Sequence, residues 1–261
     1  MPELPDVEML REYIESTSLH QKIVDVNVER TRLLRVDEPT IKRALNGCSF
    51  ERCNRHGKLV FLVTDCEPVL VMHFGMTGNV QYLRNEEDEP GYSRMRICFA
   101  NGSRLSYTSI RKLGRIDLTD DVDVYIIKNR LGPDALAIDK ERFKTIIRAS
   151  AASIKSVLMD QGKIAGVGNI YSDEMLFQAV VHPMTRANEL DDMTLDRLFH
   201  KMKHVLRIAI DHGADSRAFP GSWIVHRRTE GANCPKCGSK IEKLKISGRT
   251  SYYCSGCQIP T

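Results

Sequence analysis

Residues 234–257 read CPKCGSKIEKLKISGRTSYYCSGC, two Cys-x-x-Cys pairs separated by sixteen residues. Each pair brackets a tight turn that points two thiolates at one ion, and the spacing lies in the range of four-cysteine zinc sites. Residues 240–253 have the pattern of a β-hairpin with Ser247-Gly248 as its turn. A segment this short cannot fold by apolar burial alone, so metal binding would fold it. We predict one structural zinc ion held by Cys234, Cys237, Cys254 and Cys257, with a redox pair or chance spacing as the alternatives.

The zinc segment also carries the positive charge of the chain. The whole sequence of 261 residues has a net charge of only +4, from 38 Lys and Arg against 34 Asp and Glu. Between His226 and Cys257 there are seven Lys or Arg residues against two acids, so this stretch has +5 and the remainder −1. Such a local excess predicts a basic surface that binds a partner.

The N-terminus and the hydropathy indicate where the protein works. Residues 1–6, MPELPD, are acidic and punctuated by proline, unlike a signal or transit peptide. No apolar run approaches the roughly 18–20 residues of a membrane span. We therefore expect a soluble, cytoplasmic protein with no membrane partner, in a compartment that keeps thiols reduced. The four remaining cysteines are then expected to be buried small hydrophobes: Cys48, Cys53, Cys66 and Cys98.

Upstream of the zinc segment, a helix and a β-rich region are predicted. Val7, Leu10, Tyr13 and Ile14 have helical spacing within residues 5–18. Seven short β-rich runs separated by turn signals then argue for an antiparallel sandwich or barrel. These runs are residues 23–28, 59–63, 69–74, 80–83, 95–99, 104–107 and 115–118.

The pattern becomes helical after about residue 120. Helices are predicted over residues 140–149, 154–159, 171–179 and 189–211. Leu131-Gly132-Pro133-Asp134 is typical of a boundary between two halves. The fold class is therefore α+β, an N-terminal helix plus antiparallel β-sandwich and a C-terminal helical domain with the zinc hairpin. The predicted boundaries are 1–120 for the sandwich domain, 121–138 for a linker, 139–230 for the helical domain and 231–261 for the zinc finger.

A glycine turn, Gly166-Val167-Gly168, joins two of the predicted helices. Glycines permit close approach of the backbone, and the amides at the start of the next helix would bind a phosphate. A turn that only packs two helices together is the alternative. The basic hairpin downstream favours the phosphate interpretation, because both elements could then hold one nucleic-acid backbone.

Three of these motifs together resemble a known family. Residues 1–8 (MPELPDVE), residues 166–171 (GVGNIY) and the terminal four-cysteine finger are similar to the bifunctional DNA glycosylases that include formamidopyrimidine-DNA glycosylase and endonuclease VIII. The LPDVE and HFGMTG segments are more similar to the formamidopyrimidine branch. The resemblance implies a helix–two-turn–helix domain, a monomer that acts on damaged double-stranded DNA, and base-excision repair. Oxidised purines of the formamidopyrimidine and 8-oxoguanine type would be removed, followed by AP-lyase cleavage.

The resemblance assigns the catalytic residues to the N-terminus. Pro2, freed by removal of the methionine, would be a secondary amine that forms an iminium with the sugar and permits β- and δ-elimination. An α-amine is suited to this because its pKa is lower than that of a lysine, so more of it is neutral. Glu3 would act as acid and base at the deoxyribose, and Lys58 would contact the DNA backbone and assist elimination. A proline that merely begins a helix is the alternative for Pro2.

Further positions follow from the resemblance one at a time. Because the damaged base must leave the helix, Met76 would fill the gap and Arg111 would face the orphaned base, with Leu113 as an apolar wedge. DNA phosphates near the lesion would be held by Asn169 and Arg249, with Lys155 close to the site. The lesion pocket would include Asp6 and Glu174, whereas His73 is expected to pack rather than to catalyse.

The sequence also departs from the formamidopyrimidine branch. Leu113 stands where that branch usually has phenylalanine, Asp6 replaces a common glutamate, and Ser109-Ile110 replaces Asp-Pro. The segment formed by residues 212–233 is shorter than its counterpart in that branch, where the corresponding stretch covers an extruded base. More than one class of damaged base therefore fits the sequence. Oxidised pyrimidines or hydantoins, as for endonuclease VIII, are a second substrate class. The sequence is also compatible with a non-catalytic lesion-binding relative and with a zinc hairpin fused to an unrelated enzyme.

Overall fold

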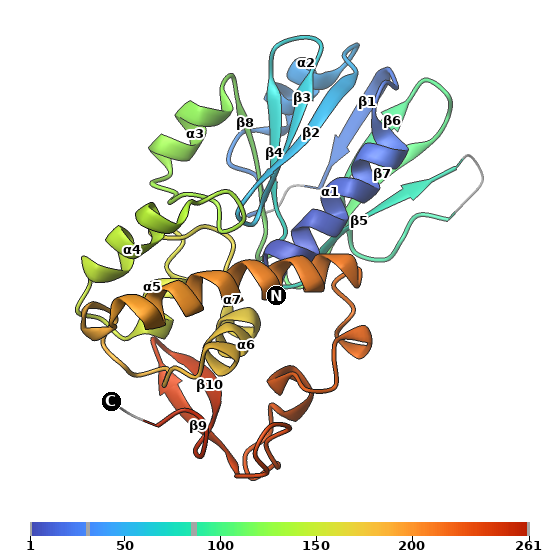
Figure 1. The fold of residues 1–261 in the computed structure, drawn as a ribbon. Helices are drawn as coiled ribbons and strands as arrows, with labels where there is room; N and C mark the ends of the chain where they lie inside the picture. The colour runs from blue at the N-terminus through green and yellow to red at the C-terminus, as the bar shows by residue number, and fades with distance from the viewer. Residues whose placement is uncertain (1, 30–31, 85–87, 260–261) are drawn as a thin grey trace. The chain divides into compact units, whose positions relative to one another are not determined.

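The computed structural model describes residues 2–29, 32–84 and 88–259, which form two compact units (Figure 1). The first unit holds Pro2 and residues 6–129, and the second holds residues 3–5 and 130–259. The division falls inside the stretch predicted as a linker, but residues of that stretch form helix α3 (Val122–Lys128) in the first unit. Within the described residues, no helix has the length and apolar character needed to cross a membrane.

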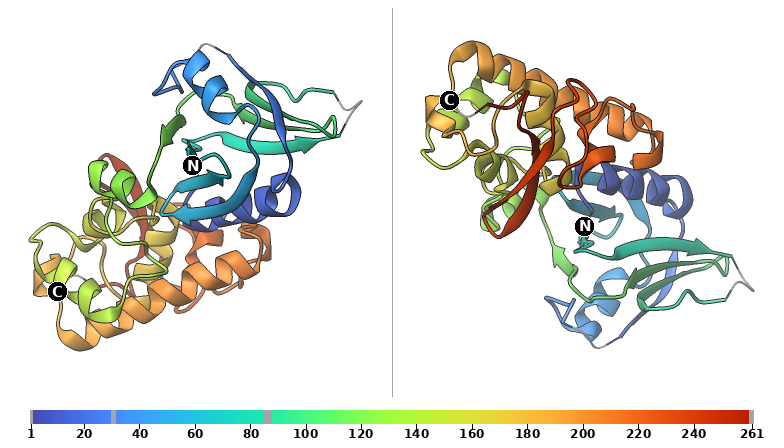
Figure 2. Two further views of the ribbon diagram at one scale, coloured as in Figure 1. Left: turned by 90° about the horizontal axis from the view of Figure 1, so that it is seen from above. Right: turned by 90° about the horizontal axis from the view of Figure 1, so that it is seen from below.

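The first unit contains an antiparallel β-sandwich, as the strand pattern predicts (Figures 1 and 2). One sheet has the order β1 (Ile23–Val28), β6 (Ser93–Phe99), β7 (Arg104–Ser109) and β5 (Gly78–Leu83). The other has the order β2 (Phe50–His56), β3 (Leu59–Thr64), β4 (Val69–His73) and β8 (Arg115–Thr119). Both sheets bury their inner faces in one core, for example Ile97 and Leu105 from the first and Leu62 and Met72 from the second. The core is closed by helices α1 (Leu4–Ser18) and α2 (Glu38–Leu45).

Two elements of this unit differ from the sequence prediction. Strand β2 was missed because its seven residues, FERCNRH, are mostly polar, and only Phe50 and Cys53 are buried. Helix α2 was also missed, although Asp37 caps it by accepting a hydrogen bond from the Thr40 amide. A short amphipathic helix with a proline in its first turn is easily mistaken for a loop.

The expectation for the cysteines outside the zinc segment is wrong for one pair. Cys48 and Cys66 form a disulfide, and Cys66 is exposed. Cys53 is buried as expected, and Cys98 is half-buried. Sequence spacing does not reveal the pair, because its members face each other only through the register of the β2–β3 hairpin.

The second unit is helical and ends in the zinc hairpin. Its helices are α4 (Lys140–Arg148), α5 (Ile154–Met159), α6 (Asn169–Ala179) and α7 (Asp192–Asp211), with short 3₁₀ turns at Ala187–Glu189, Ser216–Ala218 and Ile224–Arg227. Helix α7 starts later than predicted because Asp191 is its N-cap and accepts from the Thr194 amide. The helices share one apolar core. The hairpin consists of β9 (Ile241–Ile246) and β10 (Arg249–Cys254), which pair antiparallel around the predicted Ser247-Gly248 turn.

Candidate functional site

Glu3 is fixed at the start of helix α6 in the second unit. Its side chain is 2% exposed, and its two carboxylate oxygens accept hydrogen bonds from the amides of Ile170 (2.8 Å) and Tyr171 (3.2 Å). These amides belong to the first turn of α6, where no intrahelical acceptor exists and where the helix dipole favours a negative charge. The prediction that these amides bind a phosphate is therefore wrong for Ile170 and Tyr171, because a carboxylate of the chain itself occupies them.

The glycine turn lets residues 3 and 4 approach closely. A Cβ at Gly168 would overlap the carboxyl group of Glu3, and a Cβ at Gly166 would overlap the side chain of Leu4. Gly166 also has φ +111°, which strains any other residue, and its carbonyl accepts from the Leu4 amide at 3.0 Å. Pro2 directly precedes Glu3 in the chain. It is therefore joined by one peptide bond to a residue whose side chain is held in place.

Lys58 lies in the first unit at the tip of the β2–β3 hairpin and is almost buried at 9% exposure. The turn is shaped by Gly57, with φ +57°, whose carbonyl accepts from the Arg55 guanidinium at 3.2 Å. Arg55 is itself held by the carboxylate of Glu8, 2.5 Å away. Lys58 therefore lies on a turn that is held in place by these contacts.

His73 is a neighbour of Lys58 that remains neutral at neutral pH. Burial, followed by the charges of Arg115 and Lys58, lowers the pKa of His73 to about 4. Its Nδ1 accepts a hydrogen bond from the Gly75 amide at 3.2 Å, which orders the turn that follows. This arrangement agrees with the expectation that His73 has a packing role.

Two exposed turns of the first unit lie against each other and present apolar side chains. One turn contains Gly75, which has φ +60°, and the other contains Leu113. The two pack so closely that a Cβ on Gly75 would come 2.5 Å from the Leu113 carbonyl oxygen. The Arg111 amide donates to Thr77 Oγ1 at 3.0 Å, which joins the turns a second time. Met76 and Leu113 lie on these two joined turns and are 41% and 51% exposed, and their gap-filling role stays a prediction. Ile110, at 60% exposure, is a third apolar side chain here that sequence reasoning did not include.

Asp173 is a second site residue that the sequence does not predict. It is 1% exposed and accepts from the Lys155 ammonium and the Arg228 guanidinium. It also accepts from Ser251 Oγ at 2.7 Å and from the Tyr252 amide at 3.1 Å, both in β10. One carboxylate on α6 therefore connects α5, residues 212–233 and the zinc hairpin. No sequence signal marks it, because its partners lie 18–79 residues away.

Of the residues predicted to bind DNA, Lys155 is a partner of this carboxylate, whereas Asn169 and Arg249, which the structure also describes, have no bond to it. Lys155 is completely buried, and burial lowers its pKa even though Asp173 opposes that change. Asn169 begins α6 and donates from Nδ2 to the Thr250 carbonyl at 3.0 Å. Arg249 is exposed beside the hairpin turn. The phosphate contacts of Asn169 and Arg249 stay predictions, as does the predicted DNA-binding role of Lys155, whose side chain reaches no solvent in this structure.

Glu174 is buried in the second unit and uses both carboxylate oxygens within the chain. Oε1 accepts from Gln178 Nε2 at 2.7 Å, and Oε2 accepts from the Val225 amide at 3.0 Å. Burial raises its pKa to about 7, against the opposing hydrogen bonds and the charge of Lys236. Glu174 thus anchors residues 212–233. Its predicted place in a lesion pocket, and that of half-buried Asp6 in the first unit, stay predictions.

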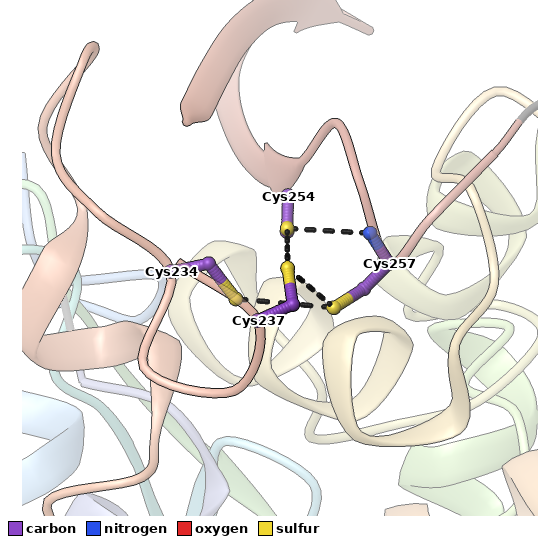
Figure 3. A group of neighbouring side chains, drawn as sticks. All are labelled: Cys234, Cys237, Cys254 and Cys257. Atoms are coloured by element: carbon purple, nitrogen blue, oxygen red, sulfur yellow. Dashed lines mark hydrogen bonds between the residues drawn. The ribbon is translucent and has the colours of Figure 1, made fainter. Parts of the chain in front are cut away.

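The four cysteines of residues 234–257 converge (Figure 3). Three sulfur–sulfur distances are 3.3, 3.5 and 3.9 Å. A tetrahedral zinc ion with Zn–S bonds of about 2.3 Å requires an edge of about 3.8 Å, so the set fits the metal. Backbone amides of Lys236 and Cys257 point at the sulfurs of Cys234 and Cys254, at 3.4 and 3.3 Å, and would stabilise thiolates.

The two Cys-x-x-Cys turns also contact the helical region of the second unit. Gln258 is buried, accepts from the Cys254 amide at 2.9 Å and donates to the Val181 carbonyl at 2.8 Å. The Lys236 ammonium lies 4.4 Å from the ring centre of Phe177 in α6. The two cysteine turns are therefore held to α6 and to the residues that directly follow it.

Comparison with known proteins gives three family matches that together cover most of the chain. Residues 1–116 match the formamidopyrimidine-DNA glycosylase N-terminal domain, and residues 131–220 match the formamidopyrimidine-DNA glycosylase H2TH domain. Residues 233–259 match the zinc finger found in FPG and IleRS.

Full-length relatives and solved structures agree with these matches. A formamidopyrimidine-DNA glycosylase of Protochlamydia amoebophila is 31% identical, with 99% of each chain covered. One of Streptococcus pyogenes is 33% identical over 99% of this chain and 98% of its own. Two structures of the Lactococcus lactis protein, one with DNA containing an abasic site and one with DNA containing FAPY-dG, both have a TM-score of 0.89 and 28% identity. They cover 98% of this chain and 99% and 100% of theirs.

Proposed function

The chain belongs to the formamidopyrimidine-DNA glycosylase family, and we propose that the amine of Pro2 performs its chemistry. The protein is a DNA N-glycosylase of base-excision repair, with the AP-lyase activity typical of the family. Its partner is damaged DNA, and its four clustered cysteines hold one structural zinc ion that would maintain the hairpin. We further propose that it acts as a monomer in the cytoplasm.

One observation supports the proline mechanism most directly: the carboxylate of Glu3 is held by two amides of α6, and Pro2 precedes it in the chain. After removal of the methionine, the proline nitrogen attacks the sugar carbon, the damaged base leaves, and the iminium acidifies the neighbouring proton. The two amides hold the Glu3 carboxylate in a fixed position directly after Pro2 in the chain. From this position Glu3 exchanges protons with the deoxyribose.

The other predicted residues have supporting roles on the DNA. Lys58, on its braced turn, contacts the backbone near the lesion and assists elimination. Met76 and Leu113 fill the space left by the extruded base, together with Ile110, and Arg111 faces the orphaned partner. Asn169 and Arg249 hold flanking phosphates, which positions the enzyme without reading the base.

We propose oxidised purines of the formamidopyrimidine and 8-oxoguanine type as substrates. Support comes from the relatives, since the L. lactis protein has been solved with DNA containing FAPY-dG, and a structure of MutM contains carbocyclic 8-oxo-G. Leu113 and the anchored residues 212–233 favour testing a second class, oxidised pyrimidines and hydantoins. A panel of duplexes, each with one defined lesion, separates the classes by their excision rates.

Borohydride trapping tests the nucleophile. With a duplex containing an abasic site, we expect a covalent complex whose mass maps to Pro2. The matched control retains Met1 through one leucine inserted before Pro2, so that the proline nitrogen is an amide and no complex forms although the duplex still binds. A trapped peptide containing Lys58 instead, or equal trapping by the extended protein, would show that another amine attacks.

A further inference from the structure

The Cys48–Cys66 disulfide lies at the open end of the β2–β3 hairpin, opposite the tip that carries Lys58. Phe50 pairs with Thr64 in the antiparallel register, and continuing this register by two residues places Cys48 directly opposite Cys66. Their Cα atoms are 5.7 Å apart, which is the spacing of facing strand residues and is within the range for disulfides.

Hydrogen bonds between Ser49 and Asp65 link the two chain segments beside the disulfide. Between the two cysteines, the Ser49 amide donates to Asp65 Oδ1 at 2.7 Å, and the Asp65 amide donates to the Ser49 carbonyl at 3.0 Å. Because these hydrogen bonds do not involve sulfur, we expect them to keep the two cysteines near each other after reduction.

The two sulfurs differ in access. Cys48 is 3% exposed, whereas Cys66 is exposed on the surface. A small thiol can therefore approach the disulfide from the Cys66 side, and attack on the Cys66 sulfur releases the sulfur of Cys48. Cys53 and Cys98 have no such partner among the described residues, and burial raises the pKa of both thiols.

We propose that Cys48–Cys66 is a reversible redox site that exchanges with small thiols and disulfides of the glutathione class. In reduction, one thiolate attacks Cys66 Sγ, forms a mixed disulfide and displaces Cys48, which takes up a proton. A second thiol attacks the outer sulfur, releases the oxidised small disulfide and leaves Cys66 as a thiol. Two electrons and two protons thus enter the protein, and the reverse sequence closes the bond. This site does not depend on the proposed repair chemistry.

Closure joins two residues that are 18 positions apart in the chain, and the closed loop includes the whole hairpin. Because a cross-link removes freedom from the unfolded chain, the oxidised protein is the more stable form. The redox state of the surroundings would then set the stability of the unit that carries Lys58.

Thiol mapping tests the exchange on the full-length, zinc-loaded protein. The protein is equilibrated with mixtures of reduced and oxidised glutathione, alkylated and digested without reduction. We expect the linked peptides of Cys48 and Cys66 to convert into two alkylated peptides as reduced glutathione increases, and to reform when the ratio is reversed. Alkylation of both residues in every mixture, or a link that no mixture opens in the folded protein, would overturn the proposal.

Thermal unfolding gives a second measurement. The oxidised wild type should unfold roughly 5–10 °C above the reduced wild type. The Cys48→Ser/Cys66→Ser protein should lack this difference, and the control Cys98→Ser should retain it.

Cys48, Asp65 and Cys66 also lie close enough to share a metal ion. A second zinc ion per chain that appears on reduction and is lost in the double variant would replace the redox assignment.

Discussion

At the scale of single residues, Glu174 shows how burial makes a carboxyl group sensitive to pH. Its anion must be held inside the protein by Gln178 and the Val225 amide, and the pKa is nevertheless raised to about 7. The folded protein therefore binds a proton between about pH 4.5 and 7 that the unfolded chain has already lost. Over this range stability falls as the pH rises, and above it the loss is complete.

The Glu174→Gln variant should remove this dependence. Urea unfolding at pH 5 and at pH 8 measures it, and the wild type should lose up to about 3 kcal/mol more than the variant between the two values. Glu189→Gln is the control, because Glu189 is exposed on the surface of the same unit. An identical pH response of the wild type and Glu174→Gln would show that Glu174 is ionised throughout.

At the scale of elements, the first turn of α6 serves as the support for the N-terminal residues. Gly168 has φ −127° and ψ −159°, a backbone conformation that alanine adopts without strain. The need for glycine there is therefore purely steric, because any Cβ would overlap the Glu3 carboxyl group.

Gly168→Ala should displace Glu3 and lower the rate of strand cleavage on an abasic duplex by about 100-fold. Affinity for the same duplex should change much less, because the substitution removes no group that contacts phosphate. Gly221→Ala is the matched control, since a Cβ there meets nothing within 4 Å. If cleavage and binding fell together, the turn would be needed for the fold rather than for placing Glu3.

The elements were predictable from the sequence to different degrees. Apolar alternation located the strands of the sandwich, and cysteine spacing located the hairpin, because both signals are local. Strand β2 was missed because it is held by its neighbour β3 rather than by its own apolar residues. The anchoring of Glu3 on Tyr171 and the role of Asp173 were not predictable, because burial of a charge is decided by partners distant in the chain.

At the scale of the whole molecule, the structure reduces the apparent charge of residues 226–257. Of the seven cations, Arg228 is neutralised by Asp173, and Lys243 lies 2.7 Å from Glu230. Arg249 and Lys245 are exposed on β10 and β9 with no ion pair among the described residues. Arg249 and Lys245 are thus two cations of the hairpin strands whose charge is not compensated by an ion pair with any described residue.

Arg249→Ala should weaken binding to all duplexes by a similar factor, with or without a lesion. The slope of log affinity against log salt should become shallower by about 1, as for the loss of one phosphate contact. Lys243→Ala is the control and should change the slope less, because Glu230 already compensates its charge. Loss of affinity at lesion duplexes alone would mean that Arg249 reads the damage.

The anchoring of Glu3 has a consequence for biosynthesis. Its carboxylate binds the amides of Ile170 and Tyr171, which are 167 and 168 residues further along the chain. At about 5–20 residues per second, the ribosome needs on the order of ten to thirty seconds to make them after Glu3 has been joined. During that time the nascent chain lacks the two amides that hold the Glu3 carboxylate. A truncated or stalled chain with a complete sandwich would therefore lack the arrangement on which the proposed chemistry depends.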